Sequence, residues 1–145
     1  MYIGKVSELT DELYEALQRL IPQMGIHKTP PTRQDLRALL KAPGATLLIA
    51  REPDENGEIV GVLSLTVYRV PTGLRSIVED VVVDEKMRRR GIAEALVRHA
   101  INIAHDAGAN GVALTSNPQR EAANQLYQSM GFERRNTNPY FYKLK

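Results

Sequence analysis

The chain contains no cysteine among its 145 residues. Disulfide bonds, thiolate metal sites and a cysteine nucleophile are therefore excluded. The absence fits a reducing cytoplasm, where disulfides are rare, although secreted proteins can also lack cysteine. We expect a cytoplasmic protein whose chemistry, if it has any, uses other side chains.

Long apolar runs and a strong charge imbalance are also missing. No stretch approaches the roughly 18 consecutive apolar residues of a membrane-spanning helix, and the N-terminal residues lack the apolar run of a signal peptide. The 19 basic and 17 acidic residues leave a net charge of only +2, too small for bulk attraction to nucleic acid or to a membrane surface. The composition indicates an ordinary globular protein with neither kind of partner.

The length of the chain fits one domain with a single core, which we expect to span residues 1–145. Apolar spacing and turn residues predict the order strand, two helices, three strands, helix, strand, helix and two strands. The expected strands cover residues 2–6, 45–50, 59–68, 77–83, 111–115, 132–134 and 140–144. The predicted fold class is α/β (α+β), with a mixed, mostly antiparallel sheet and helices on both faces.

Capping residues predict where the helices begin and end. Thr10 has the chemistry of an N-cap for the first helix, and Thr32 with Asp35 resembles the capping pair of a second. Asn117 followed by proline predicts the N-cap of the last helix, and Gly131 predicts its C-terminal cap.

The chain is organised around residues 77–107, in which an apolar strand, a basic glycine turn and a long helix follow one another. A strand that enters a helix through glycine leaves backbone N–H groups uncovered at the positive end of the helix dipole. The turn has three consecutive arginines just before Gly91, and guanidinium groups match phosphate oxygens. The stretch predicts a diphosphate cradle, and the alternative is a solvated run of charge.

The sequence Arg88-Arg89-Arg90-Gly91-Ile92-Ala93 resembles the R/Q-x-x-G-x-G/A signature of the GNAT superfamily of acyl-CoA-dependent N-acyltransferases. Ala93 stands where glycine is commoner, which the signature allows. The resemblance extends upstream to the valine-rich strand at residues 81–83. Downstream, residues 124–132 are similar to the family segment N-x-x-x-Y-x-x-x-G-F with one residue fewer between Asn124 and Tyr127. Three signals in the right order predict a GNAT fold and an N-acetyltransferase that uses acetyl-CoA as co-substrate.

The resemblance also implies which residues contact the coenzyme. Its diphosphate would rest on the basic turn, and its pantetheine arm would pair with the strand as an extra edge. A backbone N–H of that strand would receive the thioester carbonyl and stabilise the developing oxyanion. The implied cofactor-binding residues are Val81, Val82, Val83, Arg88, Arg89, Arg90, Gly91, Ile92, Ala93, Glu94 and Asn124. Three of these have simpler alternatives. Glu94 also suits a helix dipole, Arg88 could face solvent, and Asn124 could be an ordinary exposed helix residue.

Glu79 is the leading candidate for the base that takes the proton of the attacking amine. It lies in a strand that is apolar on both faces, so we expect burial to raise its pKa toward a useful range. Period two places Glu79, Val81 and Val83 on one face and Asp80 and Val82 on the other. Glu79 is also a position where many GNAT enzymes carry an acid, whereas others use a chain of water molecules. A purely structural role for Glu79 or Asp80 stays open.

Tyr127 matches the family tyrosine that meets the coenzyme A sulfur as it leaves. A phenol near pKa 10 is a weaker acid than a thiol near 8.5, so full proton transfer runs uphill by about 2 kcal/mol. We therefore expect a hydrogen bond to the departing thiolate. The alternative is core packing, because Tyr127 lies on the apolar side of its helix.

Other classes of protein find less support. The three histidines, at positions 27, 99 and 105, lack the spacing of a ligand set, so no metal is expected. No serine lies in a G-x-S-x-G elbow. The rival function is a non-catalytic acyl-CoA-binding sensor or regulatory module. The acceptor is an unidentified small-molecule or peptide amine, whose site the resemblance places at residues 24–32 and 136–142. The predicted edge strands near the C-terminus are compatible with a homodimer.

Overall fold

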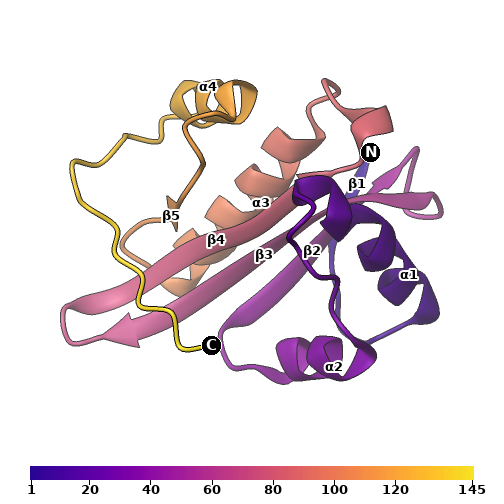
Figure 1. The fold of residues 1–145 in the computed structure, drawn as a ribbon, viewed down its shortest axis with the longest axis horizontal. Helices are drawn as coiled ribbons and strands as arrows, with labels where there is room; N and C mark the ends of the chain where they lie inside the picture. The colour runs from indigo at the N-terminus through magenta and orange to yellow at the C-terminus, as the bar shows by residue number, and fades with distance from the viewer. The chain divides into compact units, whose positions relative to one another are not determined.

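The computed structural model describes all 145 residues and divides them into two compact units, Met1–Thr115 and Ser116–Lys145. The first unit is a five-stranded sheet with helices (Figure 1). Its strands are β1 (Tyr2–Lys5), β2 (Ala45–Glu52), β3 (Glu58–Val70), β4 (Gly73–Val83) and β5 (Ala113–Leu114). Its helices are α1 (Asp11–Leu20), α2 (Arg33–Lys41) and α3 (Ile92–Ala107), with single 3-10 turns η1 (Ile21–Met24) and η2 (Glu85–Met87). The second unit contains α4 (Glu121–Ser129).

The strands lie in chain order across the sheet. Neighbours from β1 to β4 are antiparallel, because short connections join them or two helices return the chain to the edge. β5 follows α3 and runs parallel to β4, as a strand–helix–strand crossover requires. The predicted mixed, mostly antiparallel sheet is confirmed.

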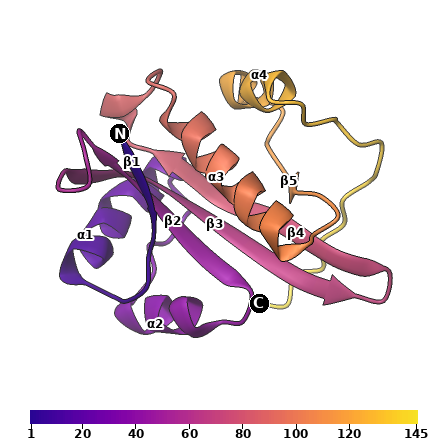
Figure 2. The same ribbon diagram turned by 180° about the vertical axis from the view of Figure 1, so that it is seen from behind.

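Helices cover both faces of the sheet. On one face, α1 and α2 pack Leu13, Leu17 and Leu36 against Leu47 and Ile49 of β2 in one buried cluster. On the other face, which is turned toward the viewer in Figure 2, α3 packs against β3 and β4. A methyl group placed on Gly61 of β3 would stand only 3.3–3.4 Å from the side chains of Leu96 and Ile92. The first turn of α3 is therefore seated directly on the sheet.

Local capping determines the first two helices, as predicted. The hydroxyl of Thr10 accepts the backbone N–H of Leu13 at 3.1 Å. Thr32 and Asp35 form a reciprocal capping box, with hydrogen bonds of 3.1 and 3.0 Å. Each cap satisfies N–H groups that a helix cannot bond internally.

The prediction for the start of the last helix is wrong. α4 begins at Glu121. The side chain of Asn117 instead accepts the N–H of Gln119 at 3.0 Å, and its carbonyl accepts the N–H of Arg120 at 2.9 Å. An asparagine can close a local turn as readily as it caps a helix, and here it closes a turn. The predicted C-terminal cap holds, because Gly131 follows the helix in a left-handed conformation, φ +100°.

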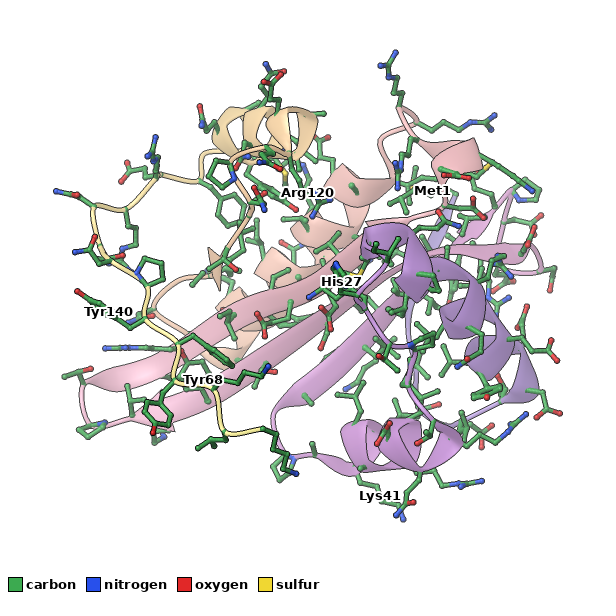
Figure 3. The ribbon with its side chains drawn as sticks, viewed as in Figure 1. Met1, His27, Lys41, Tyr68, Arg120 and Tyr140 are labelled. Atoms are coloured by element: carbon green, nitrogen blue, oxygen red, sulfur yellow. The ribbon has the colours of Figure 1, made fainter.

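The two closing strands expected at residues 132–134 and 140–144 are also wrong, because neither segment pairs with a strand. Tyr140, which Figure 3 labels on this tail, is 90% exposed. The aromatic residues Phe141 and Tyr142 are similarly exposed. Strand preference of aromatic residues depends on neighbours to pack against, and Ser116–Lys145 contains no sheet to supply them.

Candidate active site

A β-bulge interrupts β4 in the middle of the apolar strand. Val82 pairs with Val62 of β3, and Glu79 pairs with Ser64, so two residues of β4 stand opposite the single residue Leu63. Asp80, the first of those two residues, has a positive φ of 52°. Such a bulge bends its strand and marks the end of regular pairing.

The bulge changes which side chains share a face. Paired residues of an antiparallel ladder lie on the same face, so Glu79 and Val82 both lie on the face of Val62 and Ser64. Val82 and Val62 belong to the cluster under α1 and α2. The strict period-two expectation, with Glu79 beside Val83, is therefore wrong. Glu79 lies on the α1 and α2 face because one extra residue shifts the register.

Both acids of β4 are exposed. The burial expected for Glu79 is therefore wrong, and with it the physical reason that the sequence offered for tuning this carboxylate. β5 pairs only with Ile77 and Val78 of β4. From Glu79 onward the edge of β4 has no neighbouring strand on that side within Met1–Thr115.

The end of β4 presents backbone groups along this open edge. The N–H of Asp84 donates to Val60 of β3 at 2.7 Å, so by alternation Val83 directs its own N–H and carbonyl the other way. Arg88 Nε donates to that carbonyl at 3.3 Å. Val82 directs its backbone toward β3 and buries its side chain, whereas Val81 lies within the bulge. Val83 therefore carries the backbone N–H best placed for an added extended chain.

The turn after β4 leaves a row of backbone donors unused. The N–H groups of residues 88–94 have no hydrogen-bond acceptor in the protein, and the first bond of α3 runs from Ala95 to the carbonyl of Gly91. Arg89 and Gly91 both have a left-handed backbone, with φ of 64° and 77°. Nothing lies within 4 Å of where a Cβ on Gly91 would stand. The free amides lie beside open space and at the positive end of the α3 dipole. Together these features form a site that fits a diphosphate.

The three arginines divide into two roles. Arg89 and Arg90 are exposed beside the free amides and make no ion pair. Arg88 uses its Nε to hold the last carbonyl of β4. Glu94, in the first helical turn, lies 3.8 Å from Arg98 one turn later.

Sequence reasoning missed the residues that anchor the start of this turn. Arg19 of α1 lies 3.6 Å from the buried carboxylate of Asp84. Gln23 of η1 accepts the N–H of Glu85 at 2.9 Å. Arg19 and Gln23 are one helical turn apart, so their side chains lie on the same side of the helix. Nothing in the nearby sequence identifies Asp84 and Glu85 as their partners, because these residues are distant in the chain.

In the second unit, α4 holds the two motif residues that the sequence singled out. The amide of Asn124 donates to the carbonyls of Asn117 and Arg120 at 3.0 and 2.8 Å, so it braces the start of the helix. Tyr127 is buried and meets the ring of Phe132 edge to face, with centroids 5.8 Å apart. Burial raises the pKa of Tyr127, because desolvation penalises the phenolate.

No group of three or more His, Cys, Asp or Glu side chains is placed to hold a metal ion. None of the helices combines the length and apolar character needed to cross a bilayer.

A strand that ends in an open edge and feeds a helix through a row of free amides is an arrangement suited to an acyl-CoA-dependent transferase. The chain belongs to the acetyltransferase (GNAT) family, whose model matches residues 10–132. It is 33% identical over 93 residues to N-acetyltransferase family 8 member 2 of Rattus norvegicus, an alignment that covers 63% of this chain and 40% of the relative. The matched region thus spans less than half the length of that curated relative.

Solved structures share the fold over nearly the whole chain. An aminoglycoside acetyltransferase from an uncultured soil metagenomic sample superimposes with a TM-score of 0.81 at 25% identity, covering 99% of this chain and 98% of that chain. A second aminoglycoside acetyltransferase from such a sample, solved in complex with trehalose, gives a TM-score of 0.84 at 21% identity. That match covers 99% of this chain and 96% of that chain, and it supports the fold alone.

Proposed function

We propose that this protein is an N-acetyltransferase that moves an acetyl group from acetyl-CoA directly to a primary amine. The observation that carries the proposal is the row of unpaired N–H groups at residues 88–94, beside two exposed arginines and at the start of α3. Membership of the GNAT family supports the same reaction class. With no cysteine in the chain, an acyl-cysteine intermediate is excluded and direct attack of the amine is the simpler route.

The basic turn holds the diphosphate of the coenzyme, and the open edge of β4 holds its arm. Amide N–H groups of residues 89–94 donate to the phosphate oxygens, and Arg89 and Arg90 add charge-assisted hydrogen bonds. The bound coenzyme supplies the activated thioester. The N–H of Val83 points to the edge along which the arm would run. A donor that meets the thioester oxygen contributes about 10²–10³ in rate as the oxyanion forms.

Glu79 acts as the proton acceptor, directly or through water. An alkyl amine with a pKa near 10.4 is only about one part in 2,500 neutral at pH 7, so the reaction needs a base. The exposed carboxylate of Glu79 lies at the start of the open edge of β4 and is accessible to an incoming amine. Asp80 and a water chain are the alternatives.

The acceptor is a small-molecule or peptide amine. Its site includes the loop at residues 25–31, which follows η1 and carries the exposed side chain of Ile26. The same loop carries the exposed His27, which Figure 3 labels. One solved structure that shares this fold is named an aminoglycoside acetyltransferase, and aminoglycosides, which carry primary amines, belong in any first panel. Residues 1–145 act as one domain under this proposal, and a cytoplasmic location and a homodimer stay predictions.

The proposal is tested by release of free thiol. The protein is incubated with acetyl-CoA and a panel of polyamines, aminoglycosides, lysine derivatives and peptides with free N-termini. We expect thiol release that requires both acetyl-CoA and an amine, with an acetylated product detected by mass spectrometry. Stabilisation by acetyl-CoA without any thiol release would favour the non-catalytic acyl-CoA-binding module instead. If acetyl-CoA produces no heat of binding, both the proposed N-acetyltransferase and the non-catalytic acyl-CoA-binding module are ruled out.

Replacing Tyr127 by phenylalanine is expected to slow thiol release by about tenfold. Because burial raises the pKa of this phenol, it is a poor proton donor, and its contribution is a hydrogen bond to the departing thiolate. Stability is expected to change little, since the ring and its edge contact with Phe132 remain. Single-turnover kinetics measures the effect. A variant that releases thiol at the wild-type rate would assign Tyr127 to core packing.

A further inference from the structure

Asp84 is the buried acid at the junction between β4 and the basic turn. It is 6% exposed, and its groups are all engaged. One carboxylate oxygen accepts the N–H of Lys86 at 3.2 Å, and the other lies 3.6 Å from Arg19 Nε. Its backbone N–H donates to Val60, and its carbonyl accepts the N–H of Met87 at 2.8 Å. Asp84 therefore determines both the end of β4 and the direction in which η2 leaves it.

Arg19 is the cation that compensates this buried charge. It projects from the last turn of α1 and donates to the carbonyl of Ile59 at 2.6 Å. The same guanidinium lies 3.4 Å from the exposed carboxylate of Glu58 and 3.6 Å from Asp84. It thus joins α1 to the start of β3 and to the end of β4. Asp84 is buried, with 9% of its side chain exposed, whereas 39% of the Arg19 side chain is exposed. Removing Arg19 would leave the buried carboxylate without its cation, which is more disruptive than removing both charges.

A second link from the same helix end reaches the next residue of the turn. Gln23, one turn after Arg19 along α1 and η1, accepts the backbone N–H of Glu85 at 2.9 Å. Asp84 and Glu85 are thus held from one side by α1 and η1, while Arg88 holds the carbonyl of Val83. None of these three contacts uses the amides of residues 89–94. These three contacts fix the position of the turn and leave the N–H groups of residues 89–94 free to donate.

We propose that Arg19, acting through Asp84, is a positioning residue for the diphosphate turn, and that Gln23 supports it. The inference rests on the proposed function, because it concerns the same turn. Neither Arg19 nor Gln23 contacts the coenzyme. They hold the strand end so that the free amides converge, and a misplacement on the order of 1 Å can cost much of the binding. The loop at residues 25–31 begins two residues after Gln23, where η1 ends at Met24, so the acceptor side and the coenzyme side share this anchor.

The test compares two arginines that bridge α1 to the sheet. Arg51 of β2 pairs with Glu12 of α1 at 2.8 Å and donates to the carbonyl of Gly57 at 2.8 Å, as Arg19 pairs with Asp84 and Ile59. Arg51 does not contact the turn. Arg19→Gln is expected to raise the Kd for coenzyme A, measured by calorimetry, by about tenfold. Arg51→Gln is expected to lower the melting temperature by a similar amount and to leave the Kd unchanged.

Two further measurements separate positioning from simple destabilisation. The double variant Arg19→Gln with Asp84→Asn replaces the charged pair by a neutral one, and asparagine can still accept the N–H of Lys86. It is expected to recover coenzyme A affinity to within about threefold of wild type. In the thiol assay, Arg19→Gln is expected to raise KM for acetyl-CoA while kcat changes little. A double variant as weak as the single one would overturn the pairing.

The outcomes distinguish this inference from the proposed function. If wild-type protein gives no heat with coenzyme A, the proposed function fails. If wild type binds and Arg19→Gln binds equally well, only the positioning role fails. Should Arg19→Gln not fold, Gln23→Leu replaces it, because this side chain is only half-buried. A rise of about threefold in Kd for Gln23→Leu supports the anchor, and an unchanged Kd overturns it.

Discussion

Replacing Gly91 by alanine is expected to raise the Kd for coenzyme A by about a hundredfold. Gly91 has a left-handed backbone, with φ of 77°, a conformation that costs an alanine about 1–2 kcal/mol. The added methyl group would enter the open space beside the free amides of Ile92 and Ala93. This strain lowers the stability of the fold, whereas losing one charge-assisted hydrogen bond to phosphate costs about 1.5–3 kcal/mol of binding free energy. Calorimetric titration with coenzyme A measures the change.

The matched control lies at the other end of the same helix. Gly108 caps the C-terminus of α3 with φ of 86°, and nothing lies within 4 Å of its would-be Cβ either. Gly108→Ala introduces the same backbone strain without approaching the phosphate cradle. Both variants should lose similar stability in thermal unfolding, and only Gly91→Ala should lose affinity. Equal coenzyme A affinity in the two variants would remove the basic turn from the coenzyme site.

Replacing Glu79 by glutamine is expected to lower kcat at least tenfold, because a positioned base contributes about 10²–10⁴ in rate. The Kd for coenzyme A should stay within about a factor of two, since the side chain lies outside the phosphate turn. The deficit should shrink as pH rises toward about 10, where an alkyl amine loses its proton without help. A pH series of kcat for both proteins measures this convergence.

Asp80→Asn is the comparison that identifies the acid responsible. It removes the same charge at the neighbouring position, and asparagine tolerates the positive φ that Asp80 adopts in the bulge. A loss confined to Glu79→Gln assigns the base to Glu79, and a loss confined to Asp80→Asn assigns it to Asp80. If neither variant slows turnover, a water chain carries the proton and neither carboxylate acts as the base.

Features determined by adjacent residues could be predicted from the sequence. The caps at Thr10 and Thr32 depend on side chains three residues from the N–H groups they satisfy, so a short window contains all the information. The basic turn before Gly91 is similar, because its donors become free wherever a strand meets a helix through glycine. The fold class followed from such local signals together with the connection rules.

The features that sequence reasoning missed depend on more distant partners. The bulge at Asp80 exists only relative to the pairing of β3, and a count along β4 alone gives the wrong face for Glu79. The role of Arg19 depends on an acid far along the chain. The aromatic tail that contains Tyr140 has strand-forming residues but no strand to join. In each case the deciding partner lies outside any local window.

The bulge gives β4 one residue more than the stretch of β3 with which it pairs. Without Asp80, Val81 alone would stand opposite Leu63, the ladder with β3 would be continuous, and Glu79 and Val82 would keep the face that they now share. A single-residue deletion there is therefore expected to remove the bend of the strand while leaving the faces of its side chains unchanged.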